Sequence, residues 1–291
     1  MDARDSHRLL LDGATGTELD RRGVDTSLPL WSARAITDAP DVLSAIHRDY
    51  LLAGADIITA NTFRTQERTL AQAGRPGQGR ELTLRAVEIA RRARDAINSD
   101  AQVAGSVAPL EDCYEPDRSP PFEQCLEEHA DHIDALIEGG ADLLLIETMN
   151  TVHEARAAIE VARERLPGRW IASCCLRSDG PSGVLLSGEP VGALGPYLAG
   201  AFAVGVNCAS AASLAAQIDH LRRLVEPGTR LIAYANIGRP DPVRGWVNTD
   251  AVNPARYAEH ARTWLKAGAS IIGGCCGTTP ATIAALAALK V

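Results

Sequence analysis

The sequence predicts an α/β fold in which eight parallel strands close into a single (β/α)8 barrel. Short apolar runs alternate regularly with longer amphipathic segments, a pattern typical of parallel sheets that helices cover on both faces. The alternation gives eight strand–helix units, and a chain of 291 residues is of the usual size for such a barrel. An open doubly wound sheet is the competing architecture.

The strands and helices are expected in strict alternation along the chain. Apolar runs predict strands at 8–12, 56–59, 102–107, 142–147, 170–175, 202–207, 230–234 and 270–273. Helical periodicity predicts helices at 41–53, 81–98, 122–138, 153–165, 190–199, 211–225, 254–266 and 280–289. A Gly-Ala pair precedes three of the strands, where glycine is suited to ending a helix. No linker interrupts the pattern, so we expect one domain over residues 1–291.

Composition limits the kinds of partner and the compartment. The formal net charge is −8, which argues against nucleic acid or an anionic membrane surface as a partner. No apolar stretch reaches the roughly 18 residues of a membrane span, and residues 1–5 lack the apolar segment of a signal peptide. We therefore expect a cytoplasmic protein that acts on small molecules, with its seven cysteines as free thiols.

Polar residues and cysteines gather at the C-terminal ends of the predicted strands, where a barrel of this type carries its active site. These residues are Asp12, Thr59, Asn61, Ser106, Glu147, Cys174, Cys175, Asn207, Cys208, Tyr234, Asn236, Cys275 and Cys276. The pattern predicts one mouth that carries two carboxylates, several amides and five thiols.

Three of these thiols are candidate metal ligands. Cys208 follows the sixth predicted strand, and Cys275 and Cys276 follow the eighth, which is its next-but-one neighbour around a barrel. Adjacent strand residues point to opposite faces, so Cys275 and Cys276 can share an ion only if the chain leaves strand geometry there. The flanking glycines permit that: Gly273, Gly274 and Gly277. Zinc suits thiolates and takes about four ligands, so three sulfurs would leave one position open for catalysis.

Simpler interpretations of the cysteines remain. The same three thiols fit a buried structural cluster, and Cys275 and Cys276 fit a vicinal disulfide. Cys174 and Cys175 lie inside an apolar run and are expected to pack in the core. Cys113 in a loop and Cys125 on a helix are expected to be structural or incidental.

Six sequence blocks resemble the homocysteine S-methyltransferase family, in the family's order. They are LDGATGTEL at 11–19, NTF at 61–63, GSVAP at 105–109, ETM at 147–149, GVNC at 205–208 and GGCCGTTP at 273–280. The last block is highly specific, and together the blocks span nearly the whole chain. The resemblance implies a (β/α)8 barrel in which Cys208, Cys275 and Cys276 hold Zn²⁺. It also implies methyl transfer to the thiol of homocysteine at the fourth zinc position, giving methionine, with these cysteines as the catalytic residues.

The resemblance also implies which residues bind the acceptor. Asp12 and Glu147 match an acidic pair that holds the amino end, and the amides of the turn from residue 13 to 16 match a carboxylate-binding turn. Its members include Gly13, Ala14 and Thr15. Asn236 matches a substrate-binding position and is a candidate oxygen ligand of the metal when substrate is absent, with ordinary loop hydrogen bonding as the alternative. Its neighbours depart from the family's Pro-Asn-Ser-Gly or Pro-Asn-Ala-Gly segment, because residues 234–239 read YANIGR.

The methyl donor is expected to be a small free-standing molecule. A free-standing donor is favoured because no additional domain for a corrinoid is expected. Among such donors, S-methylmethionine or S-adenosylmethionine leads and betaine trails. Aromatic faces and acids attract such cations, and mouth loops contain Trp31, Tyr114, Trp246, Glu111 and Asp112, with ordinary loop packing as the alternative.

Two other functions compete. A metal-dependent hydrolase on the same barrel would use histidine and carboxylate ligands at strand ends, but the histidines fall in helices or in the N-terminal arm. A non-catalytic zinc-binding or thiol-binding barrel would keep the ligands without the transfer. A Schiff-base aldolase is excluded, since Lys266 and Lys290 both lie in predicted helices.

Overall fold

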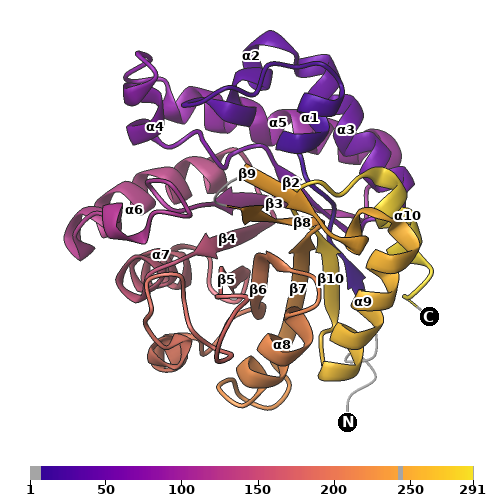
Figure 1. Cartoon of the computed structure of the whole chain (residues 1–291). Coiled ribbons are helices and arrows are strands. Elements are labelled where there is room, and N and C mark those ends of the chain that lie inside the picture. Colours follow the sequence, from indigo (N-terminus) through magenta and orange to yellow (C-terminus); the bar gives the residue numbers. More distant parts are fainter. Residues whose placement is uncertain (1–7, 242–244, 291) are drawn as a thin grey trace.

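Eight parallel strands form one sheet in the order β1-β10-β7-β6-β5-β4-β3-β2 in the computed structural model of the chain (Figure 1). The structure describes residues 8–241 and 245–290, with the backbone alone at 239–241, 245 and 246. The strands are β1 Leu9–Leu10, β2 Ile57–Ala60, β3 Gln102–Val107, β4 Leu143–Met149, β5 Trp170–Cys174, β6 Ala203–Ser210, β7 Arg230–Asn236 and β10 Ile271–Gly274. Leu11 pairs in parallel with Ile57, and this bridge joins the two edge strands. The predicted (β/α)8 barrel is confirmed.

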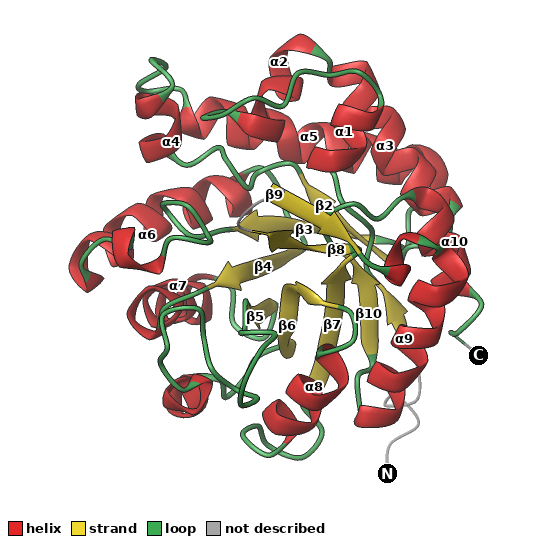
Figure 2. Ribbon diagram, in the orientation of Figure 1, coloured by secondary structure: helices red, strands yellow, loops and turns green. Residues whose placement is uncertain are grey.

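Helices form an outer ring around the strands, as Figure 2 shows. They are α3 Pro40–Leu52, α5 Gly79–Ile97, α6 Phe122–Glu138, α7 Val152–Arg165, α8 Leu214–Arg222, α9 Pro254–Ala267 and α10 Pro280–Ala287. Among the described residues, no helix is both long and apolar enough to cross a bilayer.

One segment predicted as an α-helix has a different helix type in the structure. The segment expected as a helix at 190–199 is the 3-10 helix η3, Val191–Tyr197, with Pro196 inside it. Proline has no N–H to donate to the turn before it, and Gly192 and Gly195 are poor helix formers. The segment therefore keeps its place between β5 and β6 without forming an α-helix.

Several short elements on the loops escaped the sequence pattern. They are α1 Gly16–Arg21, η1 Trp31–Arg34, α2 Ala35–Asp38, α4 Glu67–Gln72, η2 Pro116–Arg118 and η4 Asp250–Val252. A hairpin of β8 Gly238–Asp241 and β9 Gly245–Asn248 follows β7 and crosses in front of the barrel in Figure 1. These elements are too short to show a hydrophobic period, and two of them, α1 and η1, contribute residues to the pocket at the mouth.

Alternate strand residues divide the core into two layers. The inner layer fills the barrel with side chains such as Leu145, Ile171 and Ile232, while a larger outer layer packs between the strands and the helices. At Gly205 a Cβ atom would lie 1.9 Å from the carbonyl oxygen of Ile232. Glycine at this position therefore allows β6 and β7 to approach closely beneath the mouth.

Candidate active site

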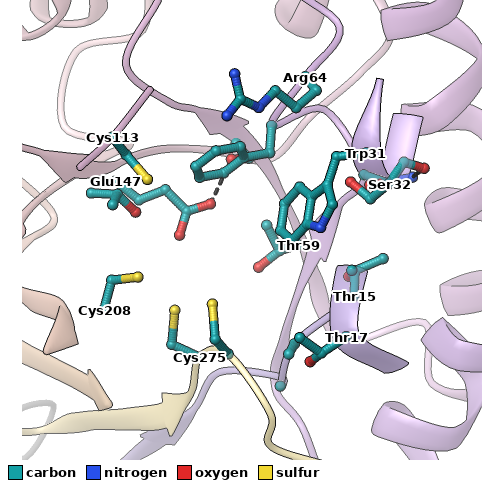
Figure 3. A pocket seen from close by; sticks show the side chains of 18 of the residues that line it. Thr15, Thr17, Trp31, Ser32, Thr59, Arg64, Cys113, Glu147, Cys208 and Cys275 are labelled. Carbon is teal, nitrogen blue, oxygen red and sulfur yellow. Dashed lines mark hydrogen bonds between the residues drawn. The ribbon is translucent and has the colours of Figure 1, made fainter. Parts of the chain in front are cut away.

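Three cysteine sulfurs converge at the C-terminal end of the barrel. The Sγ atoms of Cys208, Cys275 and Cys276 all lie within 4.8 Å of one another (Figure 3). None of the cysteines forms a disulfide, so the expectation of free thiols holds for the described residues and a vicinal Cys275–Cys276 disulfide is absent from them. The sulfur carried by β6 and the two sulfurs that follow β10 thus lie close together.

The chain leaves strand geometry at Cys275, as the flanking glycines predicted. β10 ends at Gly274, and Gly277 has a positive φ of 82° in the turn that follows. A Cβ at Gly274 would lie 2.3 Å from Thr278 Oγ1. That hydroxyl donates to the Cys275 carbonyl at 2.7 Å and accepts from the Ala14 amide at 3.1 Å. The turn therefore directs both adjacent thiols to the same side and ties them to the turn after β1.

Cys208 reaches the cluster through a local distortion of β6. Its φ is +57°, and the register of β6 against β7 shifts between Asn207 and Ser210. A bulge of this kind re-aims a side chain, and bulges are common beside active sites. A left-handed backbone at a non-glycine residue is uncommon and persists where the surroundings fix it.

Asn236 joins the two ligand-bearing segments. Its Nδ2 donates to the carbonyl of Cys208 at 3.0 Å, and its Oδ1 accepts from the amide of Cys276 at 3.1 Å. The side chain is buried and is not among the described residues that line the pocket. The oxygen expected as a metal ligand is thus already bound to a backbone amide, and the geometry gives Asn236 a role in positioning the cysteines.

A second bulge presents Glu147. β4 shifts register against β5 between Ile146 and Met149, and Thr148 has a φ of +61°. The Asn207 amide holds this bulge, because its Oδ1 accepts from Thr148 N at 3.0 Å and its Nδ2 donates to Thr148 Oγ1 at 2.8 Å. Asn207 therefore links the bulge that carries Glu147 with the bulge that carries Cys208.

Two buried carboxylates lie beside the sulfurs. Asp12 accepts from Thr59 N at 2.7 Å and from Thr59 Oγ1 at 2.9 Å. Glu147 accepts from Ser106 Oγ at 2.5 Å and from Tyr234 OH at 3.1 Å. Burial raises the pKa of Asp12 to about 7 and that of Glu147 to about 7, although these hydrogen bonds oppose the shift. Two buried carboxyl groups with pKa values near 7 are suited to binding a cation, because a positive charge beside them stabilises their ionised forms.

The pocket above these groups has a volume of about 290 Å³. The predicted residues Asp12, Gly13, Ala14, Thr15 and Glu147 all line it. Aromatic rings wall the entrance, and the Trp31 indole stands edge-on to the Phe63 ring with centroids 5.6 Å apart. A Cβ at Gly16 would lie 2.2 Å from the indole, so this glycine lets Trp31 lie against the start of α1.

Two more cysteines, which the sequence pattern assigned to packing or to an incidental loop position, contact the site. Cys113 lines the pocket, and the Cys175 thiol donates to the Cys208 carbonyl at 3.6 Å. Hydrogen bonds from Cys175, Cys275 and Cys276 lower the pKa of the Cys208 thiol. Cys174, in contrast, packs in the outer core as expected. Strand alternation assigned one of the pair 174–175 to the barrel interior, but it gave no sign that this residue touches the ligand segment.

The loop between β3 and α6 supplies further contacts. The Tyr114 hydroxyl lies 3.1 Å from Cys208 Sγ, in hydrogen-bond contact. Glu154 anchors the loop, because it accepts from Leu110 N at 2.7 Å and from Ser119 Oγ at 2.6 Å. The loop therefore holds Tyr114 over the sulfurs.

Only some of the other residues expected to contact the methyl donor lie in the pocket. Trp31 and Asp112 line the pocket, as Tyr114 does, whereas Glu111 is outside the lining and pairs with Arg68 and Arg118. The side chain of Trp246 lies outside the described residues, as does the N-terminal segment 1–7. His153, the histidine expected nearest the mouth, contacts Ser119 Oγ and the Pro120 carbonyl, and no described histidine lines the pocket. A histidine-and-carboxylate hydrolase centre is thus absent from the described pocket.

Comparison with known proteins gives a consistent result. The sequence profile of the family described as homocysteine S-methyltransferase matches residues 9–289. The chain is 36% identical to homocysteine S-methyltransferase of Escherichia coli (strain K12), over 96% of this chain and 94% of the relative. It is 30% identical to selenocysteine Se-methyltransferase of Brassica oleracea var. italica, over 95% and 87% of the two chains.

A solved structure agrees in fold over the whole length. The crystal structure of the homocysteine methyltransferase MmuM from Escherichia coli, in its metallated form, superposes with a TM-score of 0.82 at 32% identity, covering 97% of this chain and 96% of that one. The chain belongs to the homocysteine S-methyltransferase family and is a methyltransferase.

Proposed function

We propose that the protein transfers a methyl group from a small activated donor to the thiol of homocysteine, giving methionine, with Zn²⁺ held by Cys208, Cys275 and Cys276. The observation that carries the proposal is the convergence of three sulfurs within 4.8 Å beneath a pocket that also holds two buried carboxylates. Zinc favours a tetrahedral set of four ligands that includes thiolates, so three protein sulfurs leave one position for a substrate. The E. coli homocysteine methyltransferase that superposes on this chain was solved in a metallated form, which supports a metal in this chain too.

The residues present fit zinc in their chemistry. Soft sulfur ligands select zinc over magnesium or calcium, which prefer oxygen. Asn236 and Asn207 brace the ligand segments from outside, as surrounding hydrogen bonds do in metal sites. Zinc bound here would lower the pKa of an incoming thiol and so keep it as the nucleophilic thiolate.

The buried carboxylates orient the acceptor. Asp12 and Glu147 form no ion pair with a described cation, and an amino acid ammonium would supply one. Gly13 and Thr15 line the same wall, and their amides suit the acceptor's carboxylate, whereas the Ala14 amide already donates to Thr278 Oγ1. A thiol fixed in this way points toward the sulfurs, so alignment contributes most of the catalysis, on the order of 7–11 kcal/mol.

The pocket favours a small donor. Its volume of about 290 Å³ must accept both the acceptor and the reacting end of the donor, which fits S-methylmethionine better than the bulkier S-adenosylmethionine. The faces of Trp31, Phe63 and Tyr114 attract a sulfonium through cation–π interaction. We further propose that the whole chain, 1–291, acts as one barrel domain in the cytoplasm and serves methionine biosynthesis.

A paired measurement of zinc and of transfer tests the proposal. The purified protein is assayed for zinc content and for methionine formation from homocysteine with a panel of S-methylmethionine, S-adenosylmethionine and betaine. Cys275→Ser should lose zinc and transfer together. Cys125→Ser is the matched control, since this buried thiol on α6 donates to the Pro120 carbonyl and a hydroxyl retains that bond.

Two results would contradict the proposal in different ways. Full transfer activity in metal-free Cys275→Ser would show that the reaction does not need zinc. Stoichiometric zinc with no transfer from any donor would leave a non-catalytic zinc-binding barrel. Including selenocysteine among the acceptors tests whether this chain shares the activity for which the Brassica relative is named.

A further inference from the structure

One arginine in the pocket has no counter-charge. Arg64 follows β2 and lines the mouth, and its Nε is buried without a hydrogen-bond partner. The contact recorded for its guanidinium is with the ring of Phe63, whose centroid lies 5.9 Å away. Arg68, one turn later, pairs with Glu111 and Glu128. No described carboxylate pairs with Arg64, so its charge faces the pocket unneutralised.

The position of this charge separates it from the reacting centre. Figure 3 shows Arg64 at one end of the pocket and Cys208 and Cys275 at the other, with Glu147 and Trp31 between them. A molecule that touches both ends must therefore be extended.

The sign of the charge constrains the donor. An activated methyl donor of the proposed kind is a cation at the atom that carries the methyl group, and a bare guanidinium in the same pocket repels it. That repulsion becomes attraction if the donor also carries a carboxylate, because guanidinium groups bind carboxylates through two parallel charge-assisted hydrogen bonds.

A carboxylate of the protein lies in the same mouth. Asp112 lines the pocket, caps the amide of Tyr114 at 2.8 Å, and forms no ion pair with a described residue. A cation and an anion that have no described ion-pair partner thus line the same pocket, which is the charge pattern that complements a zwitterionic amino acid.

We infer that Arg64 determines donor specificity by binding the carboxylate of a small methylsulfonium with an α-amino acid end, whose ammonium Asp112 accepts. The inference rests on the proposed function and names the substrate class of its donor side. In the transfer, the methyl carbon–sulfur bond of the donor breaks and its electron pair stays on the donor sulfur, which becomes a neutral thioether. The acceptor thiolate forms the new carbon–sulfur bond, and the amino acid end keeps its contacts throughout.

The test compares donors that differ in one group. S-methylmethionine is compared with its carboxamide analogue, which lacks the negative charge, and with its des-amino analogue, which lacks the ammonium. Affinity for zinc-loaded protein is measured by calorimetry without homocysteine, so that no transfer occurs during the titration, and kcat/KM is measured by methionine formation. Arg64→Ala should weaken binding of S-methylmethionine by about 10- to 100-fold and leave the carboxamide unchanged. Asp112→Asn should weaken binding of S-methylmethionine by a similar factor and leave binding of the des-amino analogue unchanged.

The control removes the same charge elsewhere. Arg85→Ala, at an exposed position on α5, should leave every affinity unchanged. Equal weakening of the acid and the carboxamide by Arg64→Ala, or a higher KM for homocysteine instead of the donor, would overturn the inference. The binding measurement tests this inference even if no donor supports transfer. Equal affinity of wild type and Arg64→Ala for S-methylmethionine contradicts the inference, whereas absent transfer contradicts the proposed function.

Discussion

Replacing Asp12 by Asn should stabilise the substrate-free protein while impairing its binding of homocysteine. The side chains have the same shape, and Asn can keep both contacts with Thr59, accepting from the amide and donating to the hydroxyl. What the substitution removes is the cost of holding a carboxylate in a buried site. The variant therefore tests directly whether this acid is held for function at the expense of stability.

The magnitude follows from the pKa. Burial raises the pKa of Asp12 from 3.8 to about 7, so between these values the folded protein holds a proton that the unfolded chain has released. Stability consequently falls as pH rises through this window and levels off above it. About three units at roughly 1.4 kcal/mol each set the cost at pH 8 to at most about 4 kcal/mol.

Urea unfolding in the presence of a metal chelator, repeated from pH 4 to pH 8, measures this effect. The difference between Asp12→Asn and wild type should grow with pH and become constant near pH 8. Asp20→Asn on α1 removes an exposed carboxylate and should give a curve parallel to wild type. The KM of Asp12→Asn for homocysteine should rise by about 10- to 100-fold. The reasoning is refuted if Asp12→Asn is less stable than wild type at pH 8, or if the difference does not depend on pH.

Three further perturbations follow from the structure. His47 is buried on α3 with neither ring nitrogen bonded, and burial lowers its pKa from 6.5 to about 4, so wild type should lose about 3 kcal/mol as pH falls through that window. His47→Leu should lack this loss in urea unfolding, and an unchanged acid sensitivity would contradict the account. Gly205→Ala should destabilise the barrel by more than about 3 kcal/mol, because its Cβ would lie 1.9 Å from the Ile232 carbonyl oxygen, and a thermal midpoint close to that of wild type would show that the strands can separate freely. Tyr114→Phe removes the hydroxyl beside Cys208 and should lower kcat by about 3- to 10-fold with zinc content unchanged, whereas loss of zinc would show that the hydroxyl holds the cluster itself.

The pattern of the chain was sufficient to predict most of the barrel. The helix at 122–138 and the strand at 102–107 have the predicted bounds, because each presents an uninterrupted period to a single buried environment. The segment at 190–199 and the hairpin of β8 and β9 were not predicted correctly. Both are short and rich in glycine or proline, so local geometry rather than a hydrophobic period decides their conformation.

The residues of the site were also predicted only in part. The three metal-binding cysteines and the two carboxylates were found because strand ends in a barrel meet at one mouth, so a position along the chain implies a position in space. Cys113 and Arg64 gave no such signal, since their place in the pocket depends on how loops and strands pack together. Cys175 was recognised at a strand end, but its contact with the Cys208 carbonyl was not.

The sequence by itself determined the order of the strands, the residues at their C-terminal ends and the break from strand geometry at Cys275. These depend on periodicity and on the glycines, which act over a few neighbouring residues. Only the tertiary structure decided where Cys208 and Glu147 point, because each lies in a bulge that the Asn207 side chain, a contact across strands, helps to connect. It also decided that no described carboxylate pairs with Arg64, since this depends on the packing of the whole mouth and not on any one segment of the chain.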